Sequence, residues 1–450
     1  MTATKNMTTG SEAANILWFA LPMLAGNLLQ QTYNIVDTLI VGKFLGDDAL
    51  AAVGATGSIT YLFYTLCIGL SIGAGIMISQ FFGAGFIDRM KASIFNSAVI
   101  TAIFGLVISV LSVILARNAL QLLNVPAKLI DTSAAYMRIA CGGTLAVAAY
   151  NWINSVMRAL GDSKTPLMFL GVASVLNVGL DLFFVVVLKM GVSGAAWATV
   201  LAQGLSAASC IIYCFKFNST VSLSRDNMKI EKALMMKCVR MGVPIAIQNG
   251  LVSVSMVALQ SVTNSFGKTV MAAYTVSMRI EQFVQQPFSS LNAAVSNFTG
   301  QNIGAGKDKR AVKGLSAAVK ASGIFSLAVL ILFIFFSKYV VCWFVSGEKV
   351  ISVGSKALIM TACFYPFLGT IHTVRGFLNG AGDTEYAIAN GAVEVICRVG
   401  FSLILTKISG IGFWGIWITT CLTWFFTSLI SFIRYKSGKW KVKGLQEREK

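Results

Sequence analysis

Charged residues are scarce in this sequence. Of its 450 residues only 12% are charged, 56% are hydrophobic, and the mean hydropathy is +0.74. Soluble globular domains carry about 25% charged residues, so this composition excludes an ordinary water-soluble domain. The chain also has a single histidine, which excludes most zinc sites and most acid–base chemistry, and we expect no enzyme.

Nucleotide-binding and disulfide motifs are also missing. The letters FGKT at 266–269 resemble the end of a phosphate loop, but Val262 stands where the loop needs its first glycine. The letters GAGK at 304–307 lack the following Ser or Thr, so we expect no ATP hydrolysis. The nine cysteines form no CxxC pair; Cys210 and Cys214 share a helix face, but free cysteine packs as a small apolar residue, and we expect no disulfide.

Long apolar runs are what the chain has in abundance. A helix that crosses a hydrocarbon core of about 30 Å needs about 20 mostly apolar residues. The first 14 residues are polar and the run after them does not resemble a cleaved signal, so we expect it to stay as the first span. Twelve stretches fit, centred near Leu28, Leu66, Val107, Leu145, Ser174, Leu201, Val252, Val284, Leu327, Phe364, Val395 and Leu422.

The positive charge predicts the orientation. With the N-terminus inside, the inner loops and tails hold 24 of the 36 Lys and Arg residues, the outer loops nine, and three lie within helices. Inner loops of membrane proteins are enriched in Lys and Arg, so we expect a multi-pass protein of the cell membrane with both termini in the cytoplasm. The net charge of +18 is spread over many loops, and we expect no nucleic-acid partner.

An internal repeat organises the chain. A shift of 221 or 222 residues aligns Pro22 with Pro244, the GAG at 83–85 with the GAG at 304–306, and Gly161-Asp162 with Gly382-Asp383. Each half has an even number of spans, so the halves are parallel repeats related by an axis along the membrane normal. The predicted fold is all-α, with twelve transmembrane helices in two six-helix lobes. The predicted segments are a cytoplasmic tail (1–14), an N-lobe (15–216), a cytoplasmic linker (217–238), a C-lobe (239–433) and a basic tail (434–450).

Two acids deep in the first half lack counterparts in the second. Asp37 lies in the first span and Asp181 in the fifth, and a charge at mid-bilayer costs about 2.5–3.5 kcal/mol. Asn177 precedes Asp181 by one helical turn, and Ala195 and Thr199 share a face of the sixth span in the same way. Two carboxylates with amide, hydroxyl and backbone oxygens suit Na⁺, or a proton shared between the acids. The alternative is that both acids only hydrogen-bond neighbouring side chains.

The second half carries different charges. Glu394 and Arg398 are spaced i,i+4 with the acid first, which favours an intrahelical pair. Arg279 and Glu281 point to different faces, so Glu281 needs a partner elsewhere, and a cationic cargo is one option. His372 lies beside Arg375 on the tenth span, where a satisfied interior imidazole is favoured over a proton-carrying role.

Five motifs resemble those of the MATE (multidrug and toxic compound extrusion) transporters, and the resemblance extends from about residue 13 to residue 435. The resemblance implies two six-helix lobes and the export of amphipathic, often cationic compounds in exchange for Na⁺ or H⁺. The motifs are DTLIVGKFLGDDALAAVGA (37–55), NSVMRALGDSKTP (154–166), MRIEQF (278–283), GQNIGAGKDKRA (300–311) and RGFLNGAGDT (375–384).

The resemblance also assigns roles to residues. A DinF-like pattern implies that Asp37, Asn177, Asp181, Thr199 and the Ala195 carbonyl couple transport to a cation. It further implies that Pro22 marks a bend and that the cavity of the N-lobe is lined by Gln30, Tyr33, Tyr136 and Asn154. NorM-like members carry a further acid on the tenth span; here that span has His372 and no carboxylate, although Glu281 is retained.

The sequence therefore predicts an efflux antiporter that works by alternating access. We expect small organic cargo, a lipid bilayer around a monomeric protein, and no cofactor beyond the coupling ion. The alternative is a lipid-linked oligosaccharide flippase of the same broader superfamily, whose cavity would need several unpaired Arg or Lys side chains. The only deep cations that the sequence indicates are Arg138, Arg279 and Arg398, and Arg398 has an acid nearby.

Overall fold

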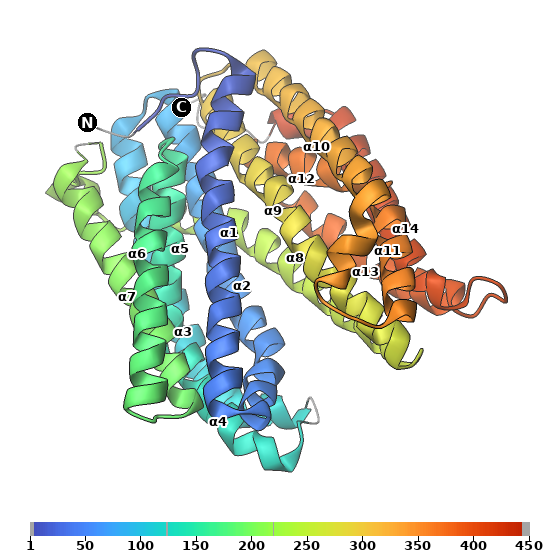
Figure 1. The fold of residues 1–450 in the computed structure, drawn as a ribbon. Helices are drawn as coiled ribbons and strands as arrows, with labels where there is room; N and C mark the ends of the chain where they lie inside the picture. Colours follow the sequence, from blue (N-terminus) through green and yellow to red (C-terminus); the bar gives the residue numbers. More distant parts are fainter. Residues whose placement is uncertain (1–3, 123–124, 219, 443–450) are drawn as a thin grey trace. The chain divides into compact units, whose positions relative to one another are not determined.

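A computed structural model describes residues 4–122, 125–218 and 220–442, and these residues form helices without a strand (Figure 1). The first half of the repeat contains α1 (Glu12–Leu45), α2 (Asp47–Ala84), α3 (Ile87–Leu122), α4 (Ala127–Gly142), α5 (Thr144–Ala159), α6 (Lys164–Asp181) with the π-helix η1 (Leu182–Val187), and α7 (Val192–Phe217). The short η2 (Arg225–Met228) follows. The second half contains α8 (Lys232–Asn264), α9 (Lys268–Gly304), α10 (Asp308–Cys342), α11 (Glu348–Ala362), α12 (Tyr365–Gly380), α13 (Tyr386–Leu405), η3 (Gly412–Trp414), α14 (Gly415–Lys436) and η4 (Lys439–Val442).

The backbone repeats with the period found in the sequence. Glycines with positive φ occur in pairs 221 residues apart, at turns where a side chain would be strained. The break between α4 and α5 at Gly143 likewise corresponds to the break between α11 and α12 at Phe364. The glycine pairs are Gly46 and Gly267, Gly85 and Gly306, Gly161 and Gly382, and Gly191 and Gly412.

Two of the twelve predicted spans are less apolar than expected. Nine helical spans of the described chain are long and apolar enough to cross a membrane, and the pair α11 and α12, bent by 50°, makes a tenth. The stretches centred near Leu145 and Val284 are helical, as α4 with α5 and as α9, but they fall outside this set. α9 buries an almost continuous run from Ala294 to Gly304, so much of its polar surface faces protein.

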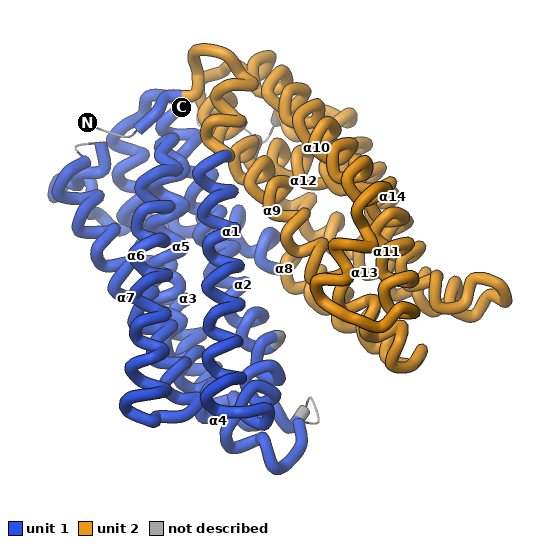
Figure 2. Tube along the Cα trace, viewed as in Figure 1, with its two compact units in different colours: residues 1–6, 21–246 blue, residues 7–20, 247–450 orange. Residues whose placement is uncertain are grey.

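The helices form two compact units (Figure 2). Unit 1 comprises residues 1–6 and 21–246, and unit 2 comprises residues 7–20 and 247–450. The beginnings of α1 and α8 thus belong to the unit built mainly from the other half of the repeat, and both change unit close to a proline, Pro22 or Pro244. The lobe, linker and tail boundaries predicted from the sequence stay a prediction.

Repeat-related arginines hold these helix beginnings. In unit 1, Arg89 Nη1 lies 2.7 Å from Glu231 Oε2, just before α8. In unit 2, Arg310 Nη1 lies 3.3 Å from Glu12 Oε1 at the start of α1. Arg310 is the repeat equivalent of Arg89, so the third helix of each half holds the first helix of the other.

Small residues let α2 and the beginning of α8 pack closely in unit 1. A Cβ atom added to Gly73 would come within 2.6 Å of the Gly242 nitrogen, and one added to Gly69 within 2.6 Å of the Ala246 Cβ. Gly69 and Gly73 are one turn apart, as are Gly242 and Ala246. Such paired small residues are typical of close helix contacts in membranes.

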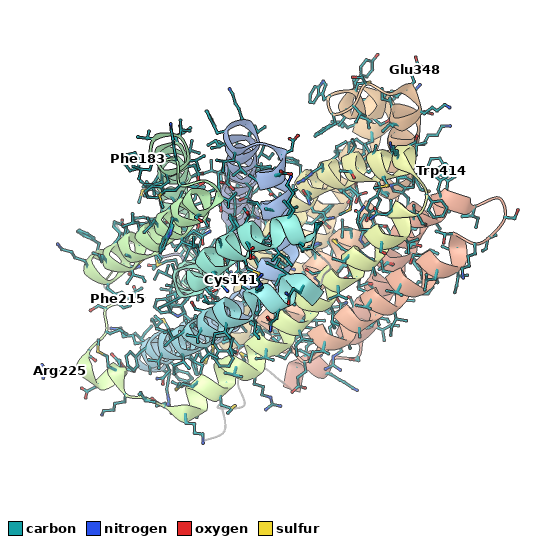
Figure 3. The ribbon with its side chains drawn as sticks, turned by 90° about the horizontal axis from the view of Figure 1, so that it is seen from below. Cys141, Phe183, Phe215, Arg225, Glu348 and Trp414 are labelled. Atoms are coloured by element: carbon teal, nitrogen blue, oxygen red, sulfur yellow. The ribbon has the colours of Figure 1, made fainter. Side chains whose placement is uncertain are left out.

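The cysteines pack as small side chains. Cys141 is fully buried among the helices of unit 1, whereas Phe183, on η1, is exposed at the periphery (Figure 3). The sulfurs of Cys210 and Cys214 lie 3.9 Å apart, well beyond the length of a disulfide bond of about 2.05 Å.

Candidate functional site

Three helices of unit 1 bring the predicted cation ligands together. Asp37 comes from α1, Asn177 and Asp181 from the last two turns of α6, and Ala195 and Thr199 from the first turns of α7. Asp181 is fully buried and Asn177 is 3% exposed. The i,i+4 spacing of each pair on α6 and α7 turns both members toward the same side of their helix.

An apolar cluster beside these residues fixes the helices against one another. It joins the end of α1, the start of α2, η1 and the start of α7, with Tyr136 of α4 at its edge. Directly after Asp181 the chain continues as the π-helix η1. π-Helices are rare in proteins, and those that occur often lie at functional sites. The buried members of the cluster are Ile40, Val41, Ala49, Val185, Val192 and Ala195.

Several buried oxygens of this group, the carboxyl oxygens above all, lack donors. Asn177 Nδ2 donates to Thr199 Oγ1 at 3.4 Å, and Thr199 Oγ1 donates to the Ala195 carbonyl at 3.2 Å. The buried Oδ1 atoms of Asp37 and Asn177 and both carboxyl oxygens of Asp181 accept no hydrogen bond from the described residues. The carboxyl groups of Asp37 and Asp181 are close enough to interact directly.

This arrangement is unfavourable when both acids are ionised. Two facing carboxylates in a dry interior repel each other, and buried acceptors without donors are costly. A shared proton removes one charge and supplies one donor; a hard cation neutralises both acids and uses oxygen ligands of this kind. The alternative in which both acids only hydrogen-bond neighbouring amides and hydroxyls lacks the donors that it requires among the described residues.

Two spaces adjoin the group of oxygens. A void of about 10 Å³ lies beside Asn177 and Thr199, close to the minimum volume for one water molecule. A larger cavity of about 620 Å³ lies next to it, and Tyr33, Tyr150, Thr199 and Gln203 border both spaces. The candidate ligand Thr199 therefore lies directly on the wall of the larger cavity.

All four residues predicted to line a cavity in the N-lobe, Gln30, Tyr33, Tyr136 and Asn154, lie on the wall of the larger space. The wall is otherwise rich in tyrosine and in uncharged polar groups. Tyr136 lies close enough to Asp37 and Asp181 for electrostatic interaction, and Tyr33 lies near Gln30 and Gln203.

Sequence reasoning missed most of the other members of this wall, among them Tyr150, Arg158 and Gln203. Helical spacing could have identified them, because residues four apart share a helix face. Tyr150 and Arg158 lie four residues before and after Asn154, and Gln203 follows Thr199 by four. Arg158 is the single charged residue among the described residues that line the cavity. The deep cations named from the sequence differ: Arg138 and Arg279 are exposed, and only Arg398 is buried.

The charged residues of the second half form a separate buried cluster in unit 2. Arg398 Nη2 donates to Glu394 Oε1 at 2.9 Å, and Arg375 Nη2 lies 3.8 Å from the other oxygen of Glu394. Arg375 Nη2 also donates to Asn390 Oδ1 at 2.7 Å. Glu281, 6% exposed, lies near Thr361 and Arg398 rather than on the wall of the 620 Å³ cavity.

The structure also shows the environments of His372 and Pro22, for which the sequence made predictions. The His372 ring stacks on Phe288, with ring centroids 6.2 Å apart. Its buried Nδ1 has no hydrogen-bond partner among the described residues, so the prediction of a satisfied imidazole is wrong at this atom. Pro22, predicted to mark a bend, lies inside α1, which continues through it.

Comparison with known proteins gives the family. The MatE family model matches residues 22–183 and again residues 244–404, once in each half of the repeat. The chain belongs to the MatE family. Members of this family are membrane transporters and not enzymes, so the chain is a multi-pass membrane transporter.

Relatives of this MatE chain carry names that refer to multidrug resistance or multidrug export. It is 30% identical over 438 residues to the "Probable multidrug resistance protein YpnP" of Bacillus subtilis (strain 168), with 97% of each chain covered. It is 23% identical over 390 residues to the "Multidrug export protein MepA" of Staphylococcus haemolyticus (strain JCSC1435), covering 84% of this chain and 85% of the relative.

Solved structures show the same fold. One described as the outward-facing conformation of a multidrug resistance MATE family transporter has a TM-score of 0.91 and 22% sequence identity, with 98% of this chain and 99% of that chain covered. The MatE chain thus has the MATE fold of twelve helices in two six-helix lobes, in which α4 with α5 and α11 with α12 each form one broken helix.

Proposed function

We propose that the protein is a secondary active antiporter that exports amphipathic, often cationic organic compounds in exchange for H⁺ or Na⁺ by alternating access. The main support for this proposal is the pair of facing carboxyl groups of Asp37 and Asp181, whose buried oxygens accept no hydrogen bond from the described residues. The names of the relatives YpnP and MepA support multidrug export. The protein works as a monomer, with no cofactor beyond the coupling ion.

The cargo binds in the 620 Å³ cavity of unit 1. Its volume lies within the range of about 300–1,000 Å³ that is typical of sites for drug-sized molecules. Tyrosines 33, 61, 64, 136 and 150 on its wall offer aromatic faces, which attract organic cations and flat ring systems. Asp37 and Asp181 lie close by, so occupation by a coupling ion changes the electrostatic field that a cationic cargo meets.

The cavity favours organic cargo over a lipid-linked pyrophosphate. A flippase would need several unpaired cations to bind two phosphates, and the described wall offers only Arg158. Growth of a flippase-deficient strain that carries the gene would support the alternative.

Imposed ion gradients identify the coupling ion. A proton gradient and a sodium gradient are imposed separately on liposomes that contain the purified protein. We expect only one of the two gradients to drive ethidium export. Export under one gradient alone names the ion, because only that ion occupies the site between Asp37 and Asp181. Equal and undiminished ethidium movement without any gradient would contradict coupling.

Both termini lie in the cytoplasm. In unit 2 the N-terminal Met7 amide donates to Gln301 at the end of α9, and Trp440, near the C-terminus, packs on Phe377 at the end of α12. Because the proposed location of the C-terminus is cytoplasmic, a fluorescent protein fused after Lys450 should fluoresce, and alkaline phosphatase fused there should be inactive. Active phosphatase would reverse the proposed orientation.

A further inference from the structure

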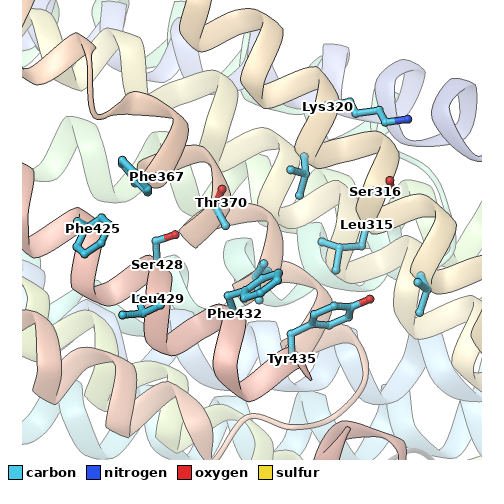
Figure 4. A pocket seen from close by; sticks show the side chains of 13 residues that line it. Leu315, Ser316, Lys320, Phe367, Thr370, Phe425, Ser428, Leu429, Phe432 and Tyr435 are labelled. Carbon is cyan, nitrogen blue, oxygen red and sulfur yellow. The ribbon is translucent and has the colours of Figure 1, made fainter. Parts of the chain in front are cut away.

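A groove of about 720 Å³ opens on unit 2 between α10, α12 and α14, apart from the cavity described above (Figure 4). Most of its wall is apolar, with Phe367, Phe425, Leu429 and Phe432 on one side. Leu429 and Phe432 are 43% and 46% exposed, so these side chains face the surroundings of the protein. In a membrane-spanning unit, those surroundings are lipid.

The apolar side chains of both helices follow one face and end in lysine. On α14 Phe425, Leu429, Phe432 and Lys436 are spaced four, three and four residues apart, which places them on one face. Lys436 Nζ lies 5.5 Å from the Phe432 ring. The ammonium group therefore lies beside the end of the groove nearest the C-terminus of α14.

The same pattern runs in the opposite direction on α10. Lys320, Ile324, Leu327 and Ile331 are again spaced four, three and four residues apart, and Ile324 is 72% exposed. Lys320 lines the groove and extends at its rim, away from the aromatic side chains (Figure 4). The apolar stripes of α10 and α14 therefore each end in a lysine, although Ile324, Leu327 and Ile331 are not part of the groove's wall.

These lysines are available for a ligand. Neither Lys320 nor Lys436 forms an ion pair with a residue that the structure describes. Lysine on a membrane-facing surface extends its ammonium toward the headgroup region while its methylene stem stays in contact with apolar surface. A phosphate group held at the rim would meet the ammonium group of Lys320, and Lys436 lies beside Phe432 on the opposite wall. The chain attached to the phosphate would lie along the aromatic wall.

We propose that this groove binds an anionic phospholipid from the leaflet on the side of the two termini. One acyl chain lies between Phe367, Phe425 and Leu429, and the phosphate contacts Lys320 and Lys436. An anionic lipid is favoured over a zwitterionic one because two unpaired lysines attract net negative charge, whereas the apolar wall serves both lipids equally. This site is independent of the cargo cavity and of the coupling ion.

Photo-crosslinking locates the lipid directly. The full-length protein is reconstituted with phosphatidylglycerol or phosphatidylcholine that carries a diazirine in one acyl chain, and the labelled peptides are mapped by mass spectrometry. We expect labelling to concentrate on residues 312–320, 367–374 and 425–435, and to be roughly tenfold stronger with phosphatidylglycerol. Uniform labelling of all membrane-facing helices, or equal labelling by the two lipids, would overturn the proposal.

Matched variants separate charge from shape. K320A/K436A should lose the preference for phosphatidylglycerol, whereas K338A, which removes an exposed lysine near the other end of α10, should retain it. L429W should reduce labelling by both lipids because it fills the groove. Loss of the preference in K338A as well, or displacement of the lipid by excess ethidium, would contradict a lipid site; the second result would assign the groove to cargo.

Discussion

Asp181→Asn should abolish ion-driven export while the protein still folds and inserts. The asparagine keeps the size of the side chain but can neither bind a transported proton nor neutralise a cation, so the group at α1, α6 and α7 loses the charge that couples ion to cargo. Because both oxygens of Asp181 lack hydrogen-bond donors among the described residues, no structural bond is lost. We expect ethidium export from proteoliposomes to fall to the level of empty liposomes.

The control for this variant lies in the same unit. Asp48 is exposed and pairs with Lys128 at 2.7 Å near the start of α2, so Asp48→Asn removes one carboxylate without touching the site. Export should stay near the wild-type rate in Asp48→Asn and be lost in Asp37→Asn, as in Asp181→Asn. Full export by both site variants, with normal yield and size-exclusion behaviour, would show that the two acids are not the coupling site.

Glu394→Leu should destabilise unit 2 more than any exposed charge substitution. Glu394 is 7% exposed and faces two guanidinium groups, those of Arg398 and Arg375, so its removal leaves two buried cations without an acid. Removing one partner of a buried ion pair costs about 3–5 kcal/mol. The measurement is the thermal unfolding midpoint of the purified protein in detergent.

Two comparisons test the cause. Glu394→Leu combined with Arg398→Met removes the pair together and should recover part of the lost stability, because fewer charges are left unpaired. Asp131→Asn breaks the exposed pair with Arg117 and should cost at most about 1 kcal/mol. A Glu394→Leu midpoint no lower than that of Asp131→Asn would contradict a structural role for the buried cluster.

Much of the architecture was predictable because the repeat left regular traces in the sequence. Glycine pairs such as Gly161 and Gly382 fall at equivalent turns with positive φ, and the two MatE matches fall one in each half. The convergence of Asp37 and Asp181 was also predictable, since a charge deep in a span requires a compensating group. Whether these acids carry the coupling ion stays a prediction.

Other features of the molecule depend on tertiary packing and do not follow from the sequence. Arg158 and Arg375 were not among the deep cations named from the sequence, yet Arg158 lines the cavity and Arg375 is mostly buried beside Glu394. Periodicity reports which residues share a helix face, but not which face meets a cavity. The crossing of α1 and α8 from one unit into the other is a tertiary feature that local sequence does not encode.

The most direct test of the central claim is whether outward movement of cargo drives an ion inward. Liposomes that contain the protein are loaded with ethidium and diluted into ethidium-free buffer with no ion gradient, while a pH-sensitive dye or radioactive sodium reports ion entry. We expect either protons or sodium ions, but not both, to enter as ethidium leaves. We expect no such entry with the Asp37→Asn variant. Ethidium release without entry of either ion, or equal ion entry in Asp37→Asn, would contradict an antiporter coupled through this carboxyl pair.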